Sequence, residues 1–351
     1  MSADLIPVFD GHNDTLLRLV LADGGRNAKS FLEAGRTGHL DLPRARKGGF
    51  CGGLFAMFTP SRFRDDDTLD LSPDDPGNFA EVSQQVAEPF TRKMIDMALA
   101  VESLSAGEVV IAHSVGEARQ AMADGKLAMI LHIEGVECLS PDLSNLHTFY
   151  QAGLRSLGPV WSRKNAFADG VPMDFPGSPD TGSGLTEAGR DLIRACNTMG
   201  IMVDLSHITE QGFWDVAKLS TKPLVASHSN AHAISQSPRN LTDRQLEAVR
   251  ASGGLVGINF HVGFLRPDGV KDERTDLDQI VAHTDHLLEK LGEDGVAFGS
   301  DFDGCMVPAA LGDAAGMPRL IERYRQAGYG ETLIRKIAAE NWLSLLERTG
   351  L

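Results

Sequence analysis

Short apolar segments recur along the chain, and most are followed by a longer amphipathic segment with the 3.6-residue period of a helix. Eight apolar segments have the length of buried strands: 5–10, 52–58, 127–134, 154–161, 201–207, 223–228, 254–260 and 295–301. The helical pattern is clearest over 81–104, 186–200, 242–253 and 276–292. Apolar strands that alternate with helices are typical of a parallel sheet covered on both faces.

Eight strand–helix units predict a closed (β/α)₈ barrel, a fold that takes about 250 residues or more with insertions. The chain has 351 residues, and we expect 1–351 to form one barrel domain. Segments near 59–79 and 163–184 are rich in Pro, Gly and Asp and are expected to be loop insertions. An open, doubly wound sheet is the alternative, but no glycine-rich phosphate loop follows the first strand.

Composition narrows the class of protein and the kind of partner. Hydrophobic residues make up 42% and charged residues 23%, as in a soluble globular protein. The formal net charge of −15 argues against nucleic acid or an anionic membrane as a partner. The four cysteines are far apart, and neither a signal-peptide pattern nor a transmembrane run occurs. We therefore expect a cytoplasmic protein with reduced thiols.

Side chains with metal-ligand chemistry stand at the carboxyl ends of the predicted strands. They are His12, Asp14, Glu134, His207, His228 and Asp301. In extended backbone His12 and Asp14 point to the same side, because side chains alternate along a strand. The carboxyl ends of barrel strands meet on one face, which is where such enzymes keep their active sites.

Each of these six residues alone also has an ordinary structural explanation, such as a hydrogen-bonded histidine or an acid in a first helical turn. Three histidines and three carboxylates together would be costly to bury without partners or a metal ion. Imidazole and carboxylate ligands suit zinc or a similar divalent ion. The number of carboxylates exceeds the need of one tetrahedral site and suggests two ions about 3.5–4 Å apart, bridged by a carboxylate.

Other histidines have weaker support as site residues. His132 lies two residues before Glu134 on the same strand; we expect it to pack, with a supporting role at the site as the alternative. His283 and His286 fall in a predicted outer helix and are expected to be structural. His261 lies just beyond the seventh strand, a position from which it can line the pocket.

The motifs around these residues resemble those of the renal or membrane dipeptidase family, zinc hydrolases in a branch of the amidohydrolase-like barrels. The resemblance spans nearly the whole chain and rests on "DGHND", "HIEG", "LSH", "SHSN", "SPRNL", "GSDFDG" and "AAENWLSLLE". It implies a soluble, bacterial-type, homodimeric enzyme that hydrolyses small dipeptides, including some with D-residues, through a metal-bridging hydroxide.

The resemblance also implies the ligand set. His12 and Asp14 would hold one zinc ion, and His207 and His228 would hold the other. Glu134 would bridge the two ions and so take part in catalysis, because they hold the hydroxide between them. Other divalent transition metals stay open, since manganese and cobalt use the same oxygen and nitrogen ligands.

By the same resemblance, Arg239 would bind the substrate's terminal carboxylate, which its planar guanidinium suits. Asp301 would accept a proton and then deliver it to the leaving amine. The family's histidine at the end of the fourth strand is replaced here by Trp161. We expect Trp161 and Arg163 to contact substrate, since both can donate a hydrogen bond to an oxyanion; for Trp161, packing of the pocket wall is the alternative.

Two other functions stay open at this stage. Trp161 and the 163–184 loop also suit a binuclear metal amidohydrolase that acts on a non-dipeptide amide, such as an N-acyl amino acid, a lactam or a biosynthetic intermediate. The third possibility is a binding or scaffold protein that keeps metal for structure. The presence of every expected ligand together with Asp301 argues against that third function.

Overall fold

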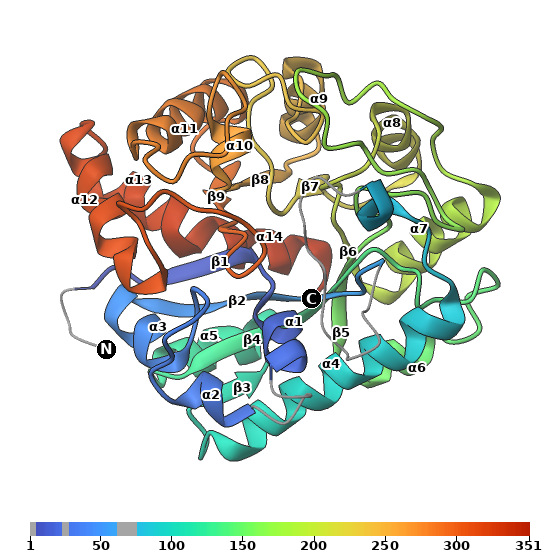
Figure 1. Cartoon of the computed structure of the whole chain (residues 1–351), viewed down its shortest axis with the longest axis horizontal. Coiled ribbons are helices and arrows are strands. Elements are labelled where there is room, and N and C mark those ends of the chain that lie inside the picture. The colour runs from blue at the N-terminus through green and yellow to red at the C-terminus, as the bar shows by residue number, and fades with distance from the viewer. Residues whose placement is uncertain (1–4, 23–27, 62–75) are drawn as a thin grey trace.

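The computed structural model describes residues 5–22, 28–61 and 76–351, and its strands form a ring surrounded by helices (Figure 1). Eight parallel strands make up the ring: β1 (Val8–Asn13), β2 (Phe50–Phe58), β4 (Leu127–Glu134), β5 (Leu154–Gly158), β6 (Met202–Val203), β7 (Val225–Ala226), β8 (Leu255–Ile258) and β9 (Val296–Phe298).

Two hydrogen-bonded sheets form this ring, one in the order β1–β2–β4–β5–β6 and the other in the order β7–β8–β9. An isolated parallel bridge between Asp204 and Val225 joins β6 to β7. A second bridge, between Asn13 and Phe302, joins the segment after β9 to β1. The two sheets therefore close into the predicted (β/α)₈ barrel.

A further strand, β3 (Val109–Ile111), was not predicted from the hydrophobic pattern. It pairs with the first part of β4, where Val109 lies opposite Leu127, whereas β5 pairs with β4 only from Leu131 onward. β3 thus covers the edge of β4 that β5 does not reach. Three residues are too few to show a strand periodicity, which is why the sequence gives no signal for it.

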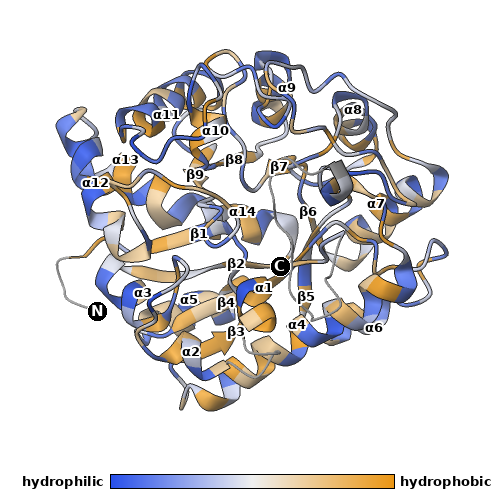
Figure 2. Cartoon of the chain, in the orientation of Figure 1, coloured by the Kyte–Doolittle hydropathy of each residue, from blue (hydrophilic) through white to orange (hydrophobic). Residues whose placement is uncertain are grey.

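Helices cover the outside of the barrel. They are α1 (Thr15–Leu21), α2 (Ala28–Leu32), α3 (Leu42–Gly48), α4 (Gln84–Leu104), α5 (Val115–Ala123), α6 (Leu146–Gln151), α7 (Glu187–Met199), α8 (Glu210–Leu219), α9 (Asp243–Ala251), α10 (Val262–Leu265), α11 (Asp278–Leu291), α12 (Met317–Gln326), α13 (Glu331–Arg335) and α14 (Asn341–Thr349). Figure 2 shows mostly apolar strands and amphipathic outer helices. No helix in the described part of the chain is long and apolar enough to cross a membrane.

Threonine caps fix where several outer helices begin. The side chains of Thr186, Thr209 and Thr242 each accept a hydrogen bond from the backbone N–H three residues later, at the start of α7, α8 and α9. In α9 the side chain of Gln245 also accepts from the Thr242 backbone, which completes a capping box. These caps fix the length of the loops that carry the polar strand-end residues.

Apolar side chains fill the interior of the barrel away from the polar strand ends, and Trp342 of α14 packs against them. Trp342 of α14 is fully buried, and its indole N–H donates to the Phe298 carbonyl oxygen at 2.7 Å. A Cβ at Gly11 would lie 2.3 Å from Trp342 Cζ2 and 2.4 Å from the Ser227 carbonyl oxygen. Only glycine therefore fits at this position of β1, one residue before His12.

Several strand ends differ from the prediction. β1 extends beyond its predicted end and includes His12, whereas β6, β7 and β9 end before His207, His228 and Asp301. His207 and Asp301 have φ values of 69° and 60°, which belong to the left-handed region and are incompatible with a strand.

The two predicted insertions are described to different extents. Residues 62–75 of the first lie outside the described residues. Residues 163–184 of the second contain no helix or strand, apart from an isolated bridge between Gly170 and Ile208. The organisation of 1–351 as a single domain stays a prediction.

Candidate metal centre

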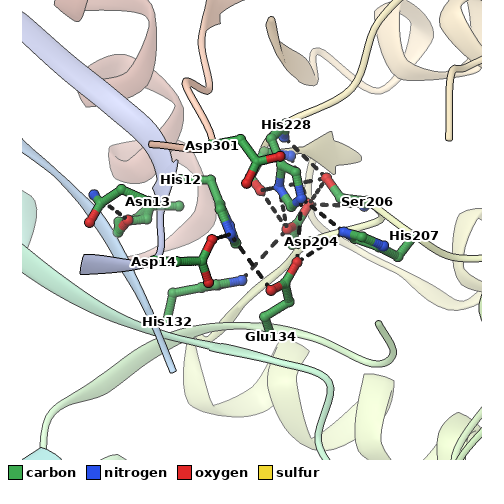
Figure 3. A network of polar contacts seen from close by, with 12 residues as sticks. His12, Asn13, Asp14, His132, Glu134, Asp204, Ser206, His207, His228 and Asp301 are labelled. Atoms are coloured by element: carbon green, nitrogen blue, oxygen red, sulfur yellow. Dashed lines mark hydrogen bonds and ion pairs between the residues drawn. The ribbon is translucent and has the colours of Figure 1, made fainter. Parts of the chain in front are cut away.

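The structure brings together all six side chains that the sequence placed at strand ends, from five different strand–loop junctions (Figure 3). His12 is the fifth residue of β1, and Asp14 follows that strand directly. Asn13 between them points away from the cluster and donates to the Leu54 carbonyl oxygen at 3.2 Å. The alternation of side chains along β1 therefore directs the imidazole of His12 and the carboxylate of Asp14 to the same side.

Glu134, the last residue of β4, presents its two carboxylate oxygens to different neighbours. Oε1 lies 2.9 Å from His207 Nε2 and 3.4 Å from His228 Nε2. Oε2 lies 3.7 Å from His12 Nε2, which in turn lies 3.4 Å from Asp14 Oδ2. One oxygen of this carboxylate is therefore available beside His207 and His228, and the other beside His12.

Among the described residues, three groups have ligand atoms that all lie within 4.8 Å of one another. The first consists of Glu134, His207 and His228, the second of His12, Asp14 and Asp301, and the third of His12, Asp204 and His228. The donors are imidazole nitrogens and carboxylate oxygens without a thiolate, a set that suits zinc and similar divalent transition metals.

The histidine nitrogens that face the centre lack ordinary hydrogen-bond partners. Both ring nitrogens of His12 are buried without a hydrogen bond among the described residues. The Nε2 atoms of His207 and His228 face each other at 3.0 Å, although each Nδ1 already contacts a serine hydroxyl at 2.8 Å. Lone pairs directed at a common point fit metal coordination better than mutual hydrogen bonding.

Burial shapes the electrostatics of the centre. It raises the pKa of Glu134 to about 8 and that of Asp301 to about 6. Burial, together with positive charge on Arg239 and His12, lowers the pKa of His207 and of His228 well below the usual value. Against the effect of burial, the negative charges of Glu134 and Asp14 raise the pKa of His12 to about 10. A dication in place of the His12 proton would leave all three imidazoles neutral and would compensate the buried carboxylates, so these residues fit a divalent metal.

His207 and Asp301 both adopt a backbone conformation that non-glycine residues rarely use. Such a residue costs about 1–3 kcal/mol and commonly marks a functional site. Gly304 is required nearby, since a Cβ there would lie 2.1 Å from Asp14 Oδ2 and 2.6 Å from Asp301 Oδ1. The motif "GSDFDG" thus combines a strained acidic residue with the glycine that leaves room for two carboxylates.

Asp204 supports His228 through Ser227, and the sequence analysis did not single it out. Its Oδ2 accepts a hydrogen bond from Ser227 Oγ at 2.5 Å, and Ser227 Oγ contacts His228 Nδ1 at 2.8 Å. The single hydroxyl hydrogen of Ser227 goes to Asp204, so the serine oxygen accepts from His228 Nδ1–H. This tautomer leaves the lone pair of His228 Nε2 for a metal.

Asp204 itself also lies within 4.8 Å of His12 and His228 and could in principle be a ligand. Its other oxygen, Oδ1, accepts from the Ser206 backbone N–H, the Ser206 hydroxyl and the Ser227 backbone N–H at 3.0, 2.9 and 2.7 Å. With both oxygens engaged, we interpret Asp204 as a support for the ligands. Its only signal in the sequence is a lone carboxylate in the apolar run "IMVDL".

His132 and Asp10 belong to the same layer of supporting residues. His132 does more than pack: its Nδ1 lies 2.8 Å from Ser156 Oγ, and its Nε2 lies 3.7 Å from Asp204 Oδ2. Asp10 accepts hydrogen bonds from the backbone N–H and the hydroxyl of Ser300 at 2.7 and 2.8 Å. Asp10 thereby holds the residue that precedes Asp301.

Histidines that the sequence assigned to structure have structural contacts. His283 on α11 is buried; its Nδ1 accepts from the Ala231 backbone N–H at 3.1 Å, and its Nε2 donates to the Leu265 carbonyl at 2.9 Å. His286 contacts Asp243 on the outer helix α9 at 2.7 Å. The structural role expected for both residues is confirmed by these contacts.

Arg239 is a buried cation beside the centre. Its guanidinium donates to the His228 carbonyl at 3.1 Å and contacts Ser229 Oγ at 3.5 Å, while Nε has no hydrogen-bond partner among the described residues. Burial lowers the pKa of Arg239 to about 10, although the negative charges of Asp301 and Glu134 act to raise it. A buried guanidinium without a carboxylate paired to it fits the anionic group of a ligand.

Trp161 and Arg163 differ in their freedom to meet a ligand. Trp161 is half-buried, and its ring centroid lies 5.8 Å from that of His207. Arg163 is buried, and its three nitrogens contact Glu137 Oε1, Ser61 Oγ and the Thr59 carbonyl at 2.6, 3.0 and 2.6 Å. All three guanidinium nitrogens therefore already have protein partners. The contact of Arg163 with substrate stays a prediction.

Comparison with known proteins gives one family over nearly the whole chain. The sequence profile of the membrane dipeptidases, peptidase family M19, matches residues 3–350. A metallo peptidase from Rhodobacter sphaeroides, liganded with a phosphinate mimic of the dipeptide L-Ala-D-Ala, is 48% identical with a TM-score of 0.93, over 99% of this chain and 100% of that one. A dipeptidase of the same peptidase family is 47% identical with a TM-score of 0.92, over 99% of each chain.

Two relatives of undescribed function are also similar in sequence. A protein in the pqqA 5′ region of Klebsiella pneumoniae is 50% identical over 243 residues, which is 69% of this chain and 90% of that protein. A protein in the PQQ-III 3′ region of Acinetobacter calcoaceticus is 41% identical over 288 residues, 82% of this chain and 90% of that protein. The sequence similarity to these relatives therefore extends well beyond the residues of the metal centre.

The hydrogen bonds of Asp204 predict its effect on metal binding. Asp204→Asn removes the acceptor that fixes the Ser227 hydroxyl and thus the tautomer of His228, and we expect metal affinity to fall about 10- to 100-fold. Competition with a chromophoric chelator measures this affinity. Asp191→Asn on the exposed surface of α7 is the matched control and should leave affinity unchanged. Unaltered affinity in Asp204→Asn would remove Asp204 from the support of the centre.

Proposed function

The chain belongs to peptidase family M19, the membrane dipeptidases, and is a metallo-dipeptidase; from this premise we propose that it hydrolyses small dipeptides with a free terminal carboxylate, using two zinc ions. We include dipeptides with a D-residue in second position, because the similar Rhodobacter sphaeroides enzyme holds a mimic of L-Ala-D-Ala. The observation that carries the proposal is Glu134, whose Oε1 faces His207 and whose Oε2 faces His12.

In the proposed centre, His12 and Asp14 would hold one ion, His207 and His228 would hold the second, and Glu134 would serve both. Such ions, when bound, lower the pKa of coordinated water and polarise the peptide carbonyl. Zinc is favoured by the imidazole and carboxylate donors, and other divalent transition metals use the same donors. Neither ring nitrogen of His12 has a hydrogen bond among the described residues, and His228 Nε2 faces His207 Nε2 at 3.0 Å, which supports this assignment.

Asp301 is the proposed proton carrier. Its Oδ2 accepts a hydrogen bond from Asn259 Nδ2 at 2.9 Å, which fixes the carboxylate, and the side chain lies beside His12 and Asp14. In this position the carboxylate accepts the proton of the attacking water and then donates it to the nitrogen of the leaving amine. The strained backbone of Asp301 supports this role, because it directs the side chain into the centre.

Arg239 is the proposed anchor for the terminal carboxylate of the substrate. Its Nε has no hydrogen-bond partner in the described part of the chain, and because it is buried it is a charge-assisted, directional donor in a site of low dielectric. The guanidinium is held by the His228 carbonyl, so the anchor and a ligand of the centre are fixed relative to each other. The anchored carboxylate thereby orients the peptide bond over the ligand groups.

We further propose a cytoplasmic location and a homodimer, both carried over from the sequence analysis. Cys51, Cys138, Cys196 and Cys305 are free thiols, which agrees with a reducing compartment. Cell fractionation and sedimentation analysis test these two proposals, and secretion or a purely monomeric protein would contradict them.

Asp301→Asn tests the proposed chemistry. The amide keeps the size of the side chain but cannot accept the proton, so we expect kcat to fall by at least about 100-fold. Metal analysis should still find two ions per chain. Wild-type, zinc-loaded protein is assayed alongside against L,L- and L,D-dipeptides and N-acyl amino acids, with exposed Asp294→Asn as the control. Retained activity would exclude Asp301, and no turnover of any dipeptide by the wild type would contradict the proposed function.

Arg239→Met tests the carboxylate anchor. Loss of the buried cation should lower kcat/KM for dipeptides by about two orders of magnitude, the usual effect of truncating a buried, hydrogen-bonded charge. Dipeptide amides lack the carboxylate, so they should be poor substrates of the wild type and no poorer for the variant. An equal loss of kcat/KM for acids and amides would show that Arg239 does not bind the carboxylate.

A further inference from the structure

Three aromatic side chains stand together at the mouth of the barrel beside His207. Phe58 ends β2, Phe79 ends the short 3₁₀ segment Pro76–Phe79, and Trp161 follows β5; together we call them the aromatic wall. The ring of Trp161 stacks on Phe79 with centroids 5.4 Å apart, and its centroid lies 4.9 Å from that of Phe58. The neighbouring His207 ring, at 5.8 Å, puts this wall in direct contact with the metal centre.

A buried ion pair fixes the aromatic wall in place. The guanidinium carbon of Arg163 lies 5.0 Å from the centroid of Phe58 and 5.5 Å from that of Trp161. Arg163 is held in turn by Glu137 after β4 and by Thr59 after β2. One guanidinium thus connects the loops after three strands, which keeps the wall rigid without presenting a free charge.

The position of the wall follows from the order of strands around the barrel. In a closed ring of β1, β2, β4, β5, β6, β7, β8 and β9, strand β2 lies opposite β7 and strand β5 lies opposite β9. Phe58 and Trp161 therefore face, across the metal ligands, the arc that carries Arg239 and Asp301. In the proposed mode of binding, a dipeptide anchored by its carboxylate at Arg239 would extend across the ligands towards the wall with its amino-terminal residue.

We propose that the aromatic wall, through Trp161, selects dipeptides whose amino-terminal residue has a large apolar side chain; this inference rests on the proposed function. Flat aromatic surfaces bind aliphatic and aromatic groups through contact area and favourable ring geometry. The one carboxylate beneath the wall, Glu137, is paired with Arg163, so the described part of the wall offers no anion to a basic side chain. Within the described part of the wall, an acidic side chain finds no free cation either, since the nitrogens of Arg163 are engaged.

The test compares dipeptides that share D-Ala in second position and differ in the first residue: Phe, Leu, Ala, Asp and Lys. For the zinc-loaded wild type we expect kcat/KM for the dipeptides that begin with Phe or Leu to exceed that for the dipeptide that begins with Ala by about tenfold or more. The kcat/KM values for the dipeptides that begin with Asp or Lys should lie below that of the Ala dipeptide. In Trp161→Ala, the kcat/KM values for the dipeptides that begin with Phe, Leu and Ala should lie within about threefold of one another, and the change should come mainly from KM. Trp161→Phe keeps a flat ring and should restore most of the preference.

A binding measurement separates this inference from the proposed function. Calorimetry with non-hydrolysable phosphinate mimics of Phe-D-Ala and Ala-D-Ala should give about tenfold tighter binding of the Phe mimic to the wild type and about equal binding to Trp161→Ala. Trp214→Phe on the outer helix α8 is the matched control and should keep the wild-type preference. Metal content and circular dichroism of each variant verify that the centre and the fold are intact.

The outcomes decide between the two claims. Hydrolysis and mimic binding with no preference for Phe or Leu, or a preference that survives in Trp161→Ala, would overturn the role of the wall. A wild type that hydrolyses no dipeptide, yet binds the Phe mimic more tightly in a manner that depends on Trp161, would contradict the proposed function and leave the apolar selectivity standing.

Discussion

A buried carboxylate shared between two groups of nitrogen and oxygen ligands is the constraint on which the site depends. Glu134 is almost fully buried, and its two oxygens face His207 and His228 on one side and His12 on the other. Burying such a group is costly unless a compensating charge is present, and burial accordingly raises its pKa to about 8. The two proposed divalent ions would satisfy this requirement and would give the inward-facing nitrogens a partner.

The barrel supplies the rigidity that this arrangement needs. Its interior is filled largely by apolar side chains and by Trp342 of α14, and the candidate metal ligands lie at the carboxyl ends of the strands. The loops beyond β6 and β9 carry positive φ values at His207 and Asp301, and the packed scaffold stabilises this strain. Asp204 and Asp10 then fix neighbouring backbone and side chains by hydrogen bonds from serines. A site held in this way needs little reorganisation when substrate binds.

The sequence predicts the scaffold and the inward-facing residues because both follow from local patterns. All eight barrel strands were expected from apolar segments, and the strand-end residues from His12 to Asp301 were expected to converge. The supporting residues were missed because they act through pairs distant in sequence, such as Asp204 with Ser227 and Asp10 with Ser300. A single sequence carries no pattern for such pairs. A single sequence also carries no pattern for the positive φ values of His207 and Asp301.

The contacts of Arg163 show another kind of pairing that a single sequence does not reveal. From the sequence, a guanidinium two residues after Trp161 looks available to a substrate, whereas its partners Glu137 and Thr59 come from loops that only the fold brings near. The same contacts give Arg163 a different significance, as the residue that fixes the aromatic wall. The departure from the family's motif at Trp161 is thus accompanied by a buried ion pair that supports the tryptophan.

The central claim is that Glu134 is shared by two metal ions, and anomalous diffraction at the zinc edge from crystals of the zinc-loaded protein tests it most directly. We expect two anomalous peaks about 3.5–4 Å apart, one near His12 and Asp14 and the other near His207 and His228, with one Glu134 oxygen at each. A single peak at full zinc loading, or two peaks of which Glu134 contacts only one, would contradict the account.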